Sequence, residues 1–192
     1  ATPGEGKTVT AVNLAIVYAW QGLKVLLVDC DLRRPHLARH FGINGNSRVD
    51  LPVVLKERVD PRSAILPSGI DGIDLLPVHA PSPNASELLG GPTMKKLLSD
   101  LSAQYDFIVL DSPPLLAASD GAVLGTMTDG VLLVVRAGYA DRGAVQQAMR
   151  QLNHVGARVV GAVLNDPESR VPRYEGRYAY DYSYADPGPV VR

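Results

Sequence analysis

The sequence predicts an α/β fold in which a mostly parallel β-sheet has helices on both faces. Three observations support this fold. Short runs of β-branched and leucine residues recur along the chain, as is typical of strands buried on both faces of a parallel sheet. A stretch with a helical pattern separates each run from the next. The 192 residues, 46% of them hydrophobic, are enough to bury one sizeable core and favour a single domain.

The first part of the chain contains a helix followed by a strand. Residues 8–21 are apolar on nearly every face and stop at Gly22, which predicts a buried helix with a glycine just beyond its end. Residues 24–29, KVLLVD, have the pattern of a short, fully buried strand. Gly, Pro and charged residues interrupt the segment 42–70, where we expect loops and a short helix near residues 51–56.

The alternation of strands and helices continues to residue 165. Further strands are predicted at 71–78, 107–111, 130–135 and 157–165, and further helices at 91–105, around 119–127 and from Asp141 onward. From Asp166 the apolar pattern ends, and Pro, Gly, Arg, Asp and Tyr dominate. We therefore expect residues 1–165 to form the domain and residues 166–192 to form a flexible tail.

The composition excludes several classes of protein. A formal net charge of −1 gives no reason to expect a nucleic-acid partner. Cys30 is the single cysteine, which excludes a disulfide framework and a multi-cysteine metal site and favours a reducing cytoplasm. The apolar runs are far shorter than the roughly 20 residues of a spanning helix, and no signal peptide is visible.

A glycine-rich segment at the start of the chain matches the phosphate-loop pattern. Residues 1–8 are ATPGEGKT, with Ala1 in place of the leading glycine. Such a loop lets successive backbone N–H groups point at an anion from a helix N-terminus. We expect Lys7 to bridge the β- and γ-phosphates of a nucleotide and the Thr8 hydroxyl to bind Mg²⁺; the alternative is a glycine turn before a helix. The residues expected to contact the nucleotide are Pro3, Gly4, Glu5, Gly6, Lys7, Thr8 and Val9.

Three aspartates follow predicted buried strands. Asp29 and Asp31 lie two residues apart after one strand, and Asp111 ends another. Ligands gather at the carboxyl ends of strands in an open α/β sheet, so we expect all three to converge on the phosphate loop. Asp111 has the position of the aspartate that holds Mg²⁺ in such nucleotide sites. The alternative for any one of them is a helix cap or a surface turn.

Four motifs in a characteristic order give the chain a family resemblance. PGEGKT, LLVDCDLR, IVLDSPP and YEGRYAYDYSY follow one another, and PSPNASELL at residues 81–89 is similar to a further family segment, with Ser82 and Ala85 in place of prolines. The chain resembles the catalytic domain of the bacterial tyrosine kinases (BY-kinases) of capsule and exopolysaccharide synthesis. The resemblance implies a P-loop NTPase-like fold, ATP and Mg²⁺ as cofactors, and protein-tyrosine kinase activity.

The resemblance also implies roles for the site residues. Lys7 would stabilise the charge of the transferred phosphoryl group, while Thr8, Asp31 and Asp111 would hold Mg²⁺. A tyrosine hydroxyl with a pKa near 10 needs a carboxylate to remove its proton, and the resemblance gives this role to Asp29. The spacing alone does not order Asp29 and Asp31, so the exchange of their roles stays open.

Three further features are open to more than one interpretation. Arg33 is expected either to orient a carboxylate or contact phosphate, or to be a solvated arginine at a helix start. Asn165 resembles a base-contacting asparagine of related sites, and a strand-end cap is the alternative. Arg33, Arg34 and Arg39 form a small basic patch with nearby histidines, which is either a solvated face or a subunit contact.

The tyrosine-rich C-terminal segment is interpreted as a substrate. Five of the eight tyrosines lie within residues 174–184, namely Tyr174, Tyr178, Tyr180, Tyr182 and Tyr184. Each phosphorylation would add roughly −1.5 to −2 charges. The resemblance implies a ring-like homo-oligomer in which the tail of one subunit enters the next active site and phosphorylation favours disassembly. The alternative is a sticky tail that binds a partner or a sugar.

The remaining expectations concern partners and completeness. The resemblance implies a membrane-bound polysaccharide co-polymerase as activator, fused or separate, and so a cytoplasmic location at the inner face of the membrane. A P-loop ATPase of the partition or regulator type, acting as a nucleotide switch, is the alternative function, although Thr2 stands where that group has a signature lysine. Because the chain opens on the phosphate loop, we expect a fragment that lacks its first strand and folds poorly or is weakly active alone.

Overall fold

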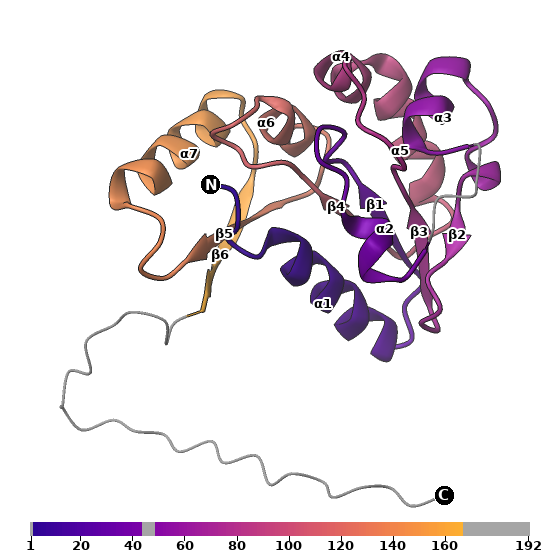
Figure 1. Cartoon of the computed structure of the whole chain (residues 1–192), viewed down its shortest axis with the longest axis horizontal. Coiled ribbons are helices and arrows are strands. Elements are labelled where there is room, and N and C mark those ends of the chain that lie inside the picture. Colours follow the sequence, from indigo (N-terminus) through magenta and orange to yellow (C-terminus); the bar gives the residue numbers. More distant parts are fainter. Residues whose placement is uncertain (1, 44–48, 167–192) are drawn as a thin grey trace, which may run out of the picture.

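The structure is a computed structural model that describes residues 2–43 and 49–166 (Figure 1). The helices are α1 (Lys7–Trp20), α2 (Leu37–His40), α3 (Leu51–Glu57), α4 (Ala85–Gly90), α5 (Pro92–Ser102), α6 (Asp120–Gly125) and α7 (Arg142–His154), with a 3₁₀ turn η1 at Pro61–Ser63. The strands are β1 (Val25–Asp29), β2 (Leu66–Pro67), β3 (Ile73–Leu76), β4 (Phe107–Asp111), β5 (Val131–Arg136) and β6 (Val159–Asn165). The predicted α/β class is confirmed.

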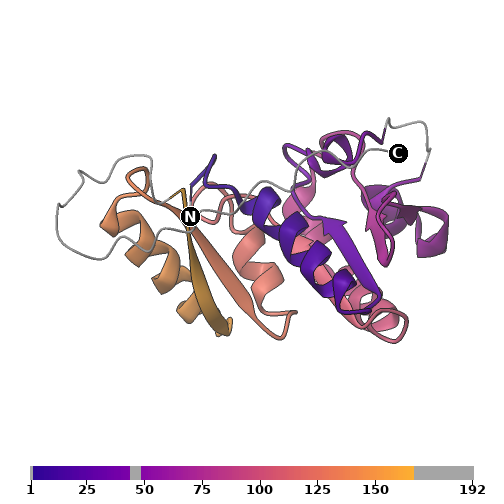
Figure 2. The same ribbon diagram turned by 90° about the horizontal axis from the view of Figure 1, so that it is seen from below.

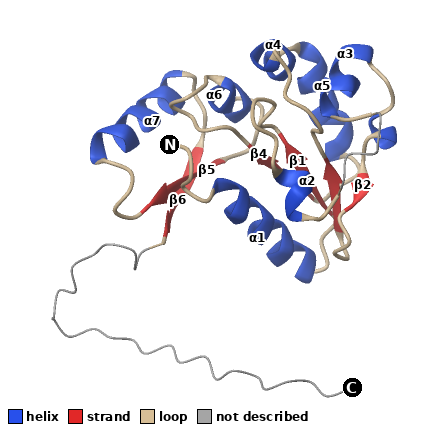
Figure 3. Ribbon diagram, viewed as in Figure 1, coloured by secondary structure: helices blue, strands red, loops and turns tan. Residues whose placement is uncertain are grey.

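The strands are mostly parallel, as predicted, but they form two sheets. The first sheet has the order β2-β3-β1-β4, in which β3 and β4 run parallel to β1 and the two-residue β2 runs antiparallel to β3. The second sheet pairs β5 and β6 in parallel. Among the described residues, no strand joins β4 to β5 by hydrogen bonds, so the two sheets are separate between these strands (Figure 3).

Helices cover both faces of the first sheet, because side chains of a strand alternate between its faces. Val25 and Leu27 of β1 pack with α1 and α2 on one face, where Ala15 and Leu37 are fully buried. Leu26 and Val28 point to the other face and pack in the cluster formed with α3, α4 and α5, as the alternation requires. Figure 2 shows α1 lying along the strands of this sheet.

The second sheet is covered by α6 and α7. Leu133 of β5 packs with Ala148 and Leu152 of α7 in a separate cluster. On the other face of β6, the side chains of Val160 and Leu164 are exposed, so the burial of β6 alternates along its length. Among the described residues, only one face of this sheet is therefore covered.

The expectation of a helix buried on every face is wrong for α1 within the described residues. Ala11 and Ala15 are buried against the first sheet, but Val9 and Val17 are about half exposed and Trp20 is 80% exposed. The apolar pattern located the helix, whose bounds agree with the prediction to within one residue at each end. The pattern could not show which apolar side chains of the helix would be buried against other elements.

Candidate nucleotide site

The phosphate loop leads into α1 through two glycines in the left-handed region. Gly4 has φ of 76° and Gly6, at the N-cap of α1, has φ of 87°. A side chain at either position would be strained, so glycine is required for this path of the backbone. Pro3 and Gly4 form the turn, and the Thr10 hydroxyl donates to the Gly6 carbonyl at 2.9 Å. The predicted glycine-rich loop before a helix is thus present.

The side chains of the loop bind its own backbone. The Glu5 carboxylate is fully buried and accepts a hydrogen bond from the backbone N–H of Thr2. The Lys7 Nζ donates to the Thr2 carbonyl at 3.0 Å. Glu5 was predicted as a nucleotide contact. In the structure its buried carboxylate stabilises the loop through the hydrogen bond from Thr2.

The Lys7 ammonium lies in an acidic and half-buried environment. Burial lowers its pKa, and the carboxylates of Glu5, Asp111 and Asp31 oppose that shift. A lysine that is partly stripped of water and close to several carboxylates is held near the place where an anion must bind. The structure therefore brings Lys7 together with two of the three aspartates expected around it.

Asp29 and Asp111 lie at the carboxyl ends of neighbouring strands. They are paired in the register of β1 with β4, and both are buried. Burial raises the pKa of Asp111 to about 6, although the Thr8 hydroxyl and the Lys7 ammonium counteract the rise. Thr8, predicted as a metal ligand with Asp111, is thus close enough to that carboxylate to affect its pKa.

Asp29 differs from Asp31 in burial and in what it binds. Asp29 is fully buried, and its two oxygens accept backbone N–H groups of Asp31 at 3.1 Å and Leu37 at 3.2 Å. Burial and then the nearby Asp111 raise the pKa of Asp29 to about 7, against the effect of these hydrogen bonds. Asp31 is half-buried and accepts the N–H groups of Arg33 and Arg34. The sequence spacing could not distinguish the two, whereas their surroundings do.

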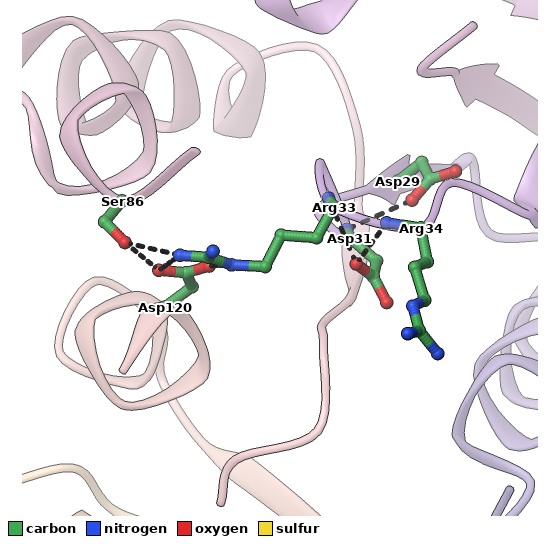
Figure 4. A network of polar contacts seen from close by, with 6 residues as sticks. All are labelled: Asp29, Asp31, Arg33, Arg34, Ser86 and Asp120. Carbon is green, nitrogen blue, oxygen red and sulfur yellow. Dashed lines mark hydrogen bonds and ion pairs between the residues drawn. The ribbon is translucent and has the colours of Figure 1, made fainter. Parts of the chain in front are cut away.

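Arg33 belongs to a network that the sequence did not reveal (Figure 4). Its Nε donates to the Asp120 carboxylate at 2.8 Å, and its second guanidinium nitrogen donates to the Ser86 hydroxyl at 2.9 Å. Ser86 also donates to Asp120. Burial would raise the pKa of Asp120, but the hydrogen bonds from Arg33 and Ser86 outweigh it and hold the pKa below its usual value. Of the roles weighed for Arg33, an ion pair with a buried carboxylate is the one observed.

Asn165 contacts the phosphate loop, although the two are far apart in the sequence. Its amide Nδ2 donates to the Glu5 carbonyl at 3.0 Å. A Cβ at Gly6 would lie 2.1 Å from that same nitrogen, so the close approach also requires glycine. Asn165 therefore joins β6 to the loop, and this contact differs from the strand-end cap considered as the alternative.

The donor set has few carboxylates. No group of three or more His, Cys, Asp or Glu residues with the geometry of a metal site occurs among the residues that the structure describes. Thr8, Asp111 and Asp31 supply one hydroxyl and two carboxylates, and Mg²⁺ in nucleotide sites characteristically takes one or two carboxylates together with phosphates and water. These residues fit such an ion.

Two expectations concern other parts of the chain. The described helices include none that is long and apolar enough to cross a membrane. The tail tyrosines, Tyr174, Tyr178, Tyr180, Tyr182 and Tyr184, lie outside the described residues.

Comparisons of sequence identify relatives of the chain. The family model described as AAA domain matches residues 2–162. Tyrosine-protein kinase YwqD of Bacillus subtilis is 38% identical over 165 residues, which cover 86% of this chain and 69% of that protein. Putative tyrosine-protein kinase EpsB of Ralstonia nicotianae is 35% identical over 95% of this chain. Tyrosine-protein kinase etk of Escherichia coli is 35% identical over 86% of it. The chain spans only 25% and 22% of the latter two proteins.

Comparisons of structure identify neighbours of the same kind. The VpsO kinase domain has a TM-score of 0.80 and 37% identity, with coverage of 85% of this chain and 80% of that one. The kinase domain of the Escherichia coli tyrosine kinase ETK has a TM-score of 0.82 and 34% identity, with coverage of 94% and 69%. The cell division ATPase MinD of Pyrococcus furiosus, at 24% identity and a TM-score of 0.70, shows the shared fold alone. The phosphate loop, the strand-end aspartates and these relatives together show that the chain belongs to the bacterial tyrosine kinases, on a P-loop NTPase-like fold.

Proposed function

We propose that the chain binds Mg-ATP and transfers its γ-phosphoryl group to tyrosines of its own C-terminal cluster. The observation that supports this most is the convergence of Lys7, Thr8 and two strand-end aspartates, Asp29 and Asp111, at one edge of the sheet. A structural neighbour of 25% identity, a cobyrinic acid a,c-diamide synthase, was solved with an ATP analogue and magnesium. The acceptors would be Tyr174, Tyr178, Tyr180, Tyr182 and Tyr184.

The proposed transfer is a single displacement at the γ-phosphorus. The tyrosine oxygen forms a bond to that phosphorus while the bond to the β–γ bridging oxygen breaks and ADP leaves. The tyrosine proton moves to a carboxylate, for which Asp29 is the first candidate because its pKa near 7 suits a base at neutral pH. Asp31, the more exposed of the two, is the second candidate.

Positioning and charge neutralisation are the remaining tasks of the protein. The backbone N–H groups of residues 4–8 would bind the phosphates at the start of α1, and Lys7 would exchange its hydrogen bond to the Thr2 carbonyl for one to a phosphate oxygen. Thr8, Asp111 and Asp31 would hold Mg²⁺. When bound, Mg²⁺ neutralises charge on the phosphate oxygens.

The wider role follows from the family and is part of the proposal. The protein would regulate the synthesis or chain length of a capsular or extracellular polysaccharide. Its activator would be a membrane-bound polysaccharide co-polymerase, fused or separate, which would place the domain at the cytoplasmic face of the membrane. Subunits would form a ring in which one tail enters the neighbouring site, and the added negative charge would favour disassembly.

The test is the formation of phosphotyrosine. The full-length protein is incubated with Mg-ATP, and modified residues are mapped by mass spectrometry. We expect phosphate on the tail tyrosines of the wild type and none in Lys7→Met, which loses the charge that faces the phosphates. Replacement of all five tail tyrosines by Phe should remove most of the signal. Undiminished phosphotyrosine in the five-Phe variant, or release of inorganic phosphate alone, would refute the proposal.

A further inference from the structure

A basic pocket beside the loop that bears Asp31 has no part in the proposed transfer. It has a volume of about 440 Å³ and lies between the loop after β1, helix α2 and the segment that follows β3. Five basic side chains line it: Arg33, Arg34, His36, Arg39 and His79. The other lining residues are apolar, and no Asp or Glu is among them. The pocket therefore combines positive charge with an apolar wall.

Much of this positive charge is available to a ligand. Arg33 is bound to Asp120 and Ser86, but Arg34 and Arg39 are exposed and form no ion pair with any residue that the structure describes. His79 Nε2 is buried and lacks a hydrogen-bond partner within the described part of the chain. An anionic group is the ligand that this combination favours.

The pocket is joined to the nucleotide site through one short loop. The backbone N–H groups of Arg33 and Arg34 both donate to the Asp31 carboxylate, at 3.2 Å and 2.9 Å. The same two residues supply arginine side chains to the pocket. A peptide that presents a tyrosine to Asp29 or Asp31 would therefore pass close to the pocket with its neighbouring residues.

We propose that the pocket binds the acidic residues that flank an acceptor tyrosine, and that the occupant is segment 178–186 of a second copy of this chain. This inference rests on the proposed transfer to tyrosine. Segment 178–186, YAYDYSYAD, has Asp181 between Tyr180 and Tyr182, has Asp186 two residues after Tyr184, and has no Lys or Arg. Neighbouring side chains of an extended peptide point in opposite directions, so Tyr180 or Tyr182 can face the site while Asp181 faces the arginines. Asp186 lies on the same side as the tyrosines in such a peptide and adds to the negative charge of the segment.

Peptide binding tests the inference independently of catalysis. A fluorescent peptide of residues 178–188 is titrated with the full-length protein and a non-hydrolysable ATP analogue, and fluorescence anisotropy gives the Kd. The control peptide has Asp181→Asn and Asp186→Asn. Because the protein's own tail competes with both peptides equally, the ratio of the two Kd values is the readout. We expect the acidic peptide to bind about tenfold more tightly, as for charge-assisted hydrogen bonds to two arginines.

The double variant Arg34→Ala/Arg39→Ala should bring this ratio close to one, while the exposed Arg142→Ala on α7 should leave it unchanged. In a charge exchange, Arg34→Glu/Arg39→Glu should prefer a peptide with Asp181→Lys and Asp186→Lys. A ratio near one in the wild type, or a ratio that the double variant does not alter, would overturn the inference. If the ratio behaves as expected but no phosphotyrosine forms, the proposed function fails and the pocket assignment stands as a peptide site.

Discussion

The protonation of Asp29 affects the stability of the nucleotide-free protein. Its folded pKa of about 7 lies above the ordinary value of 3.8, so folding stabilises the protonated form. The contribution is fully present below the unfolded pKa and is lost as the pH rises through the folded pKa. Asp111, with a folded pKa of about 6, acts in the same direction. The nucleotide-free protein should therefore lose stability between about pH 4 and pH 7.

The variant Asp29→Asn should reduce that pH dependence by roughly half, because Asp111 supplies the remainder. The measurement is the melting temperature of the nucleotide-free protein across this pH range. The matched control is Asp106→Asn, an exposed carboxylate in the turn before β4. An unchanged slope in Asp29→Asn would show that Asp29 is ionised in the folded protein throughout the range.

Asp120 is expected to act on the site from a distance, through Arg33. Asp120→Asn removes the charge that holds the guanidinium, and the loop whose backbone N–H groups bind Asp31 loses its anchor on α6. We expect kcat to fall about tenfold, as for outer residues that orient a ligand, while KM for ATP changes little. Arg33→Lys should retain part of the activity. A fall in melting temperature with kcat preserved would instead indicate a purely structural ion pair.

For single residues, the sequence was enough to locate the parts of the candidate site that lie within one segment. The glycines, Lys7 and Thr8 are contiguous, and Asp111 follows an apolar run, so local pattern was sufficient. The Arg33–Asp120 pair joins residues 87 positions apart, and nothing near Asp120 in sequence distinguishes it from an ordinary helix start. The contact of Asn165 with the loop spans 160 positions and likewise depends on the fold.

At the scale of elements, the apolar runs predicted the strands well and the short elements poorly. The bounds of β4 agree with the predicted 107–111, and those of β1 agree to within a residue, because both strands are apolar up to their final aspartate. All of β1 is buried, whereas β4 is partly buried. Helix α2 has four residues and β2 has two, which is too short for any period to appear. Helix α4 was also not predicted, and α6, which has six residues as well, was located only approximately, because six residues give less than two turns.

Helix α1 should be sensitive to substitution on one face alone. Ala15 is fully buried against the first sheet, whereas Trp20, the single tryptophan, is 80% exposed. We expect Ala15→Leu to overpack this interface and lower the free energy of unfolding by about 1–3 kcal/mol. Trp20→Ser should change it by less than about 0.5 kcal/mol. Denaturant titration measures both; a large loss for Trp20→Ser would mean that this face of α1 is covered in the folded protein.

For the whole molecule, the order of the elements and the mostly parallel strands followed from sequence, but the interruption between β4 and β5 did not. Hydrophobic pattern shows which segments are strands, and it contains no information on which strands are hydrogen-bonded. The nucleotide site nevertheless draws on both sheets, because Asn165 ends β6 and binds the loop that precedes α1. The relation between the sheets therefore matters for activity as well as for stability.

We expect one triphosphate to bind between the phosphate loop and the strand-end aspartates. An experimental structure of the full-length protein with a non-hydrolysable ATP analogue and Mg²⁺ would show this directly. In it, Lys7 Nζ should leave the Thr2 carbonyl for the β- and γ-phosphates, and the metal should contact the Thr8 hydroxyl close to Asp111. A nucleotide bound elsewhere, or phosphates out of reach of Lys7 and the backbone of residues 4–8, would contradict it.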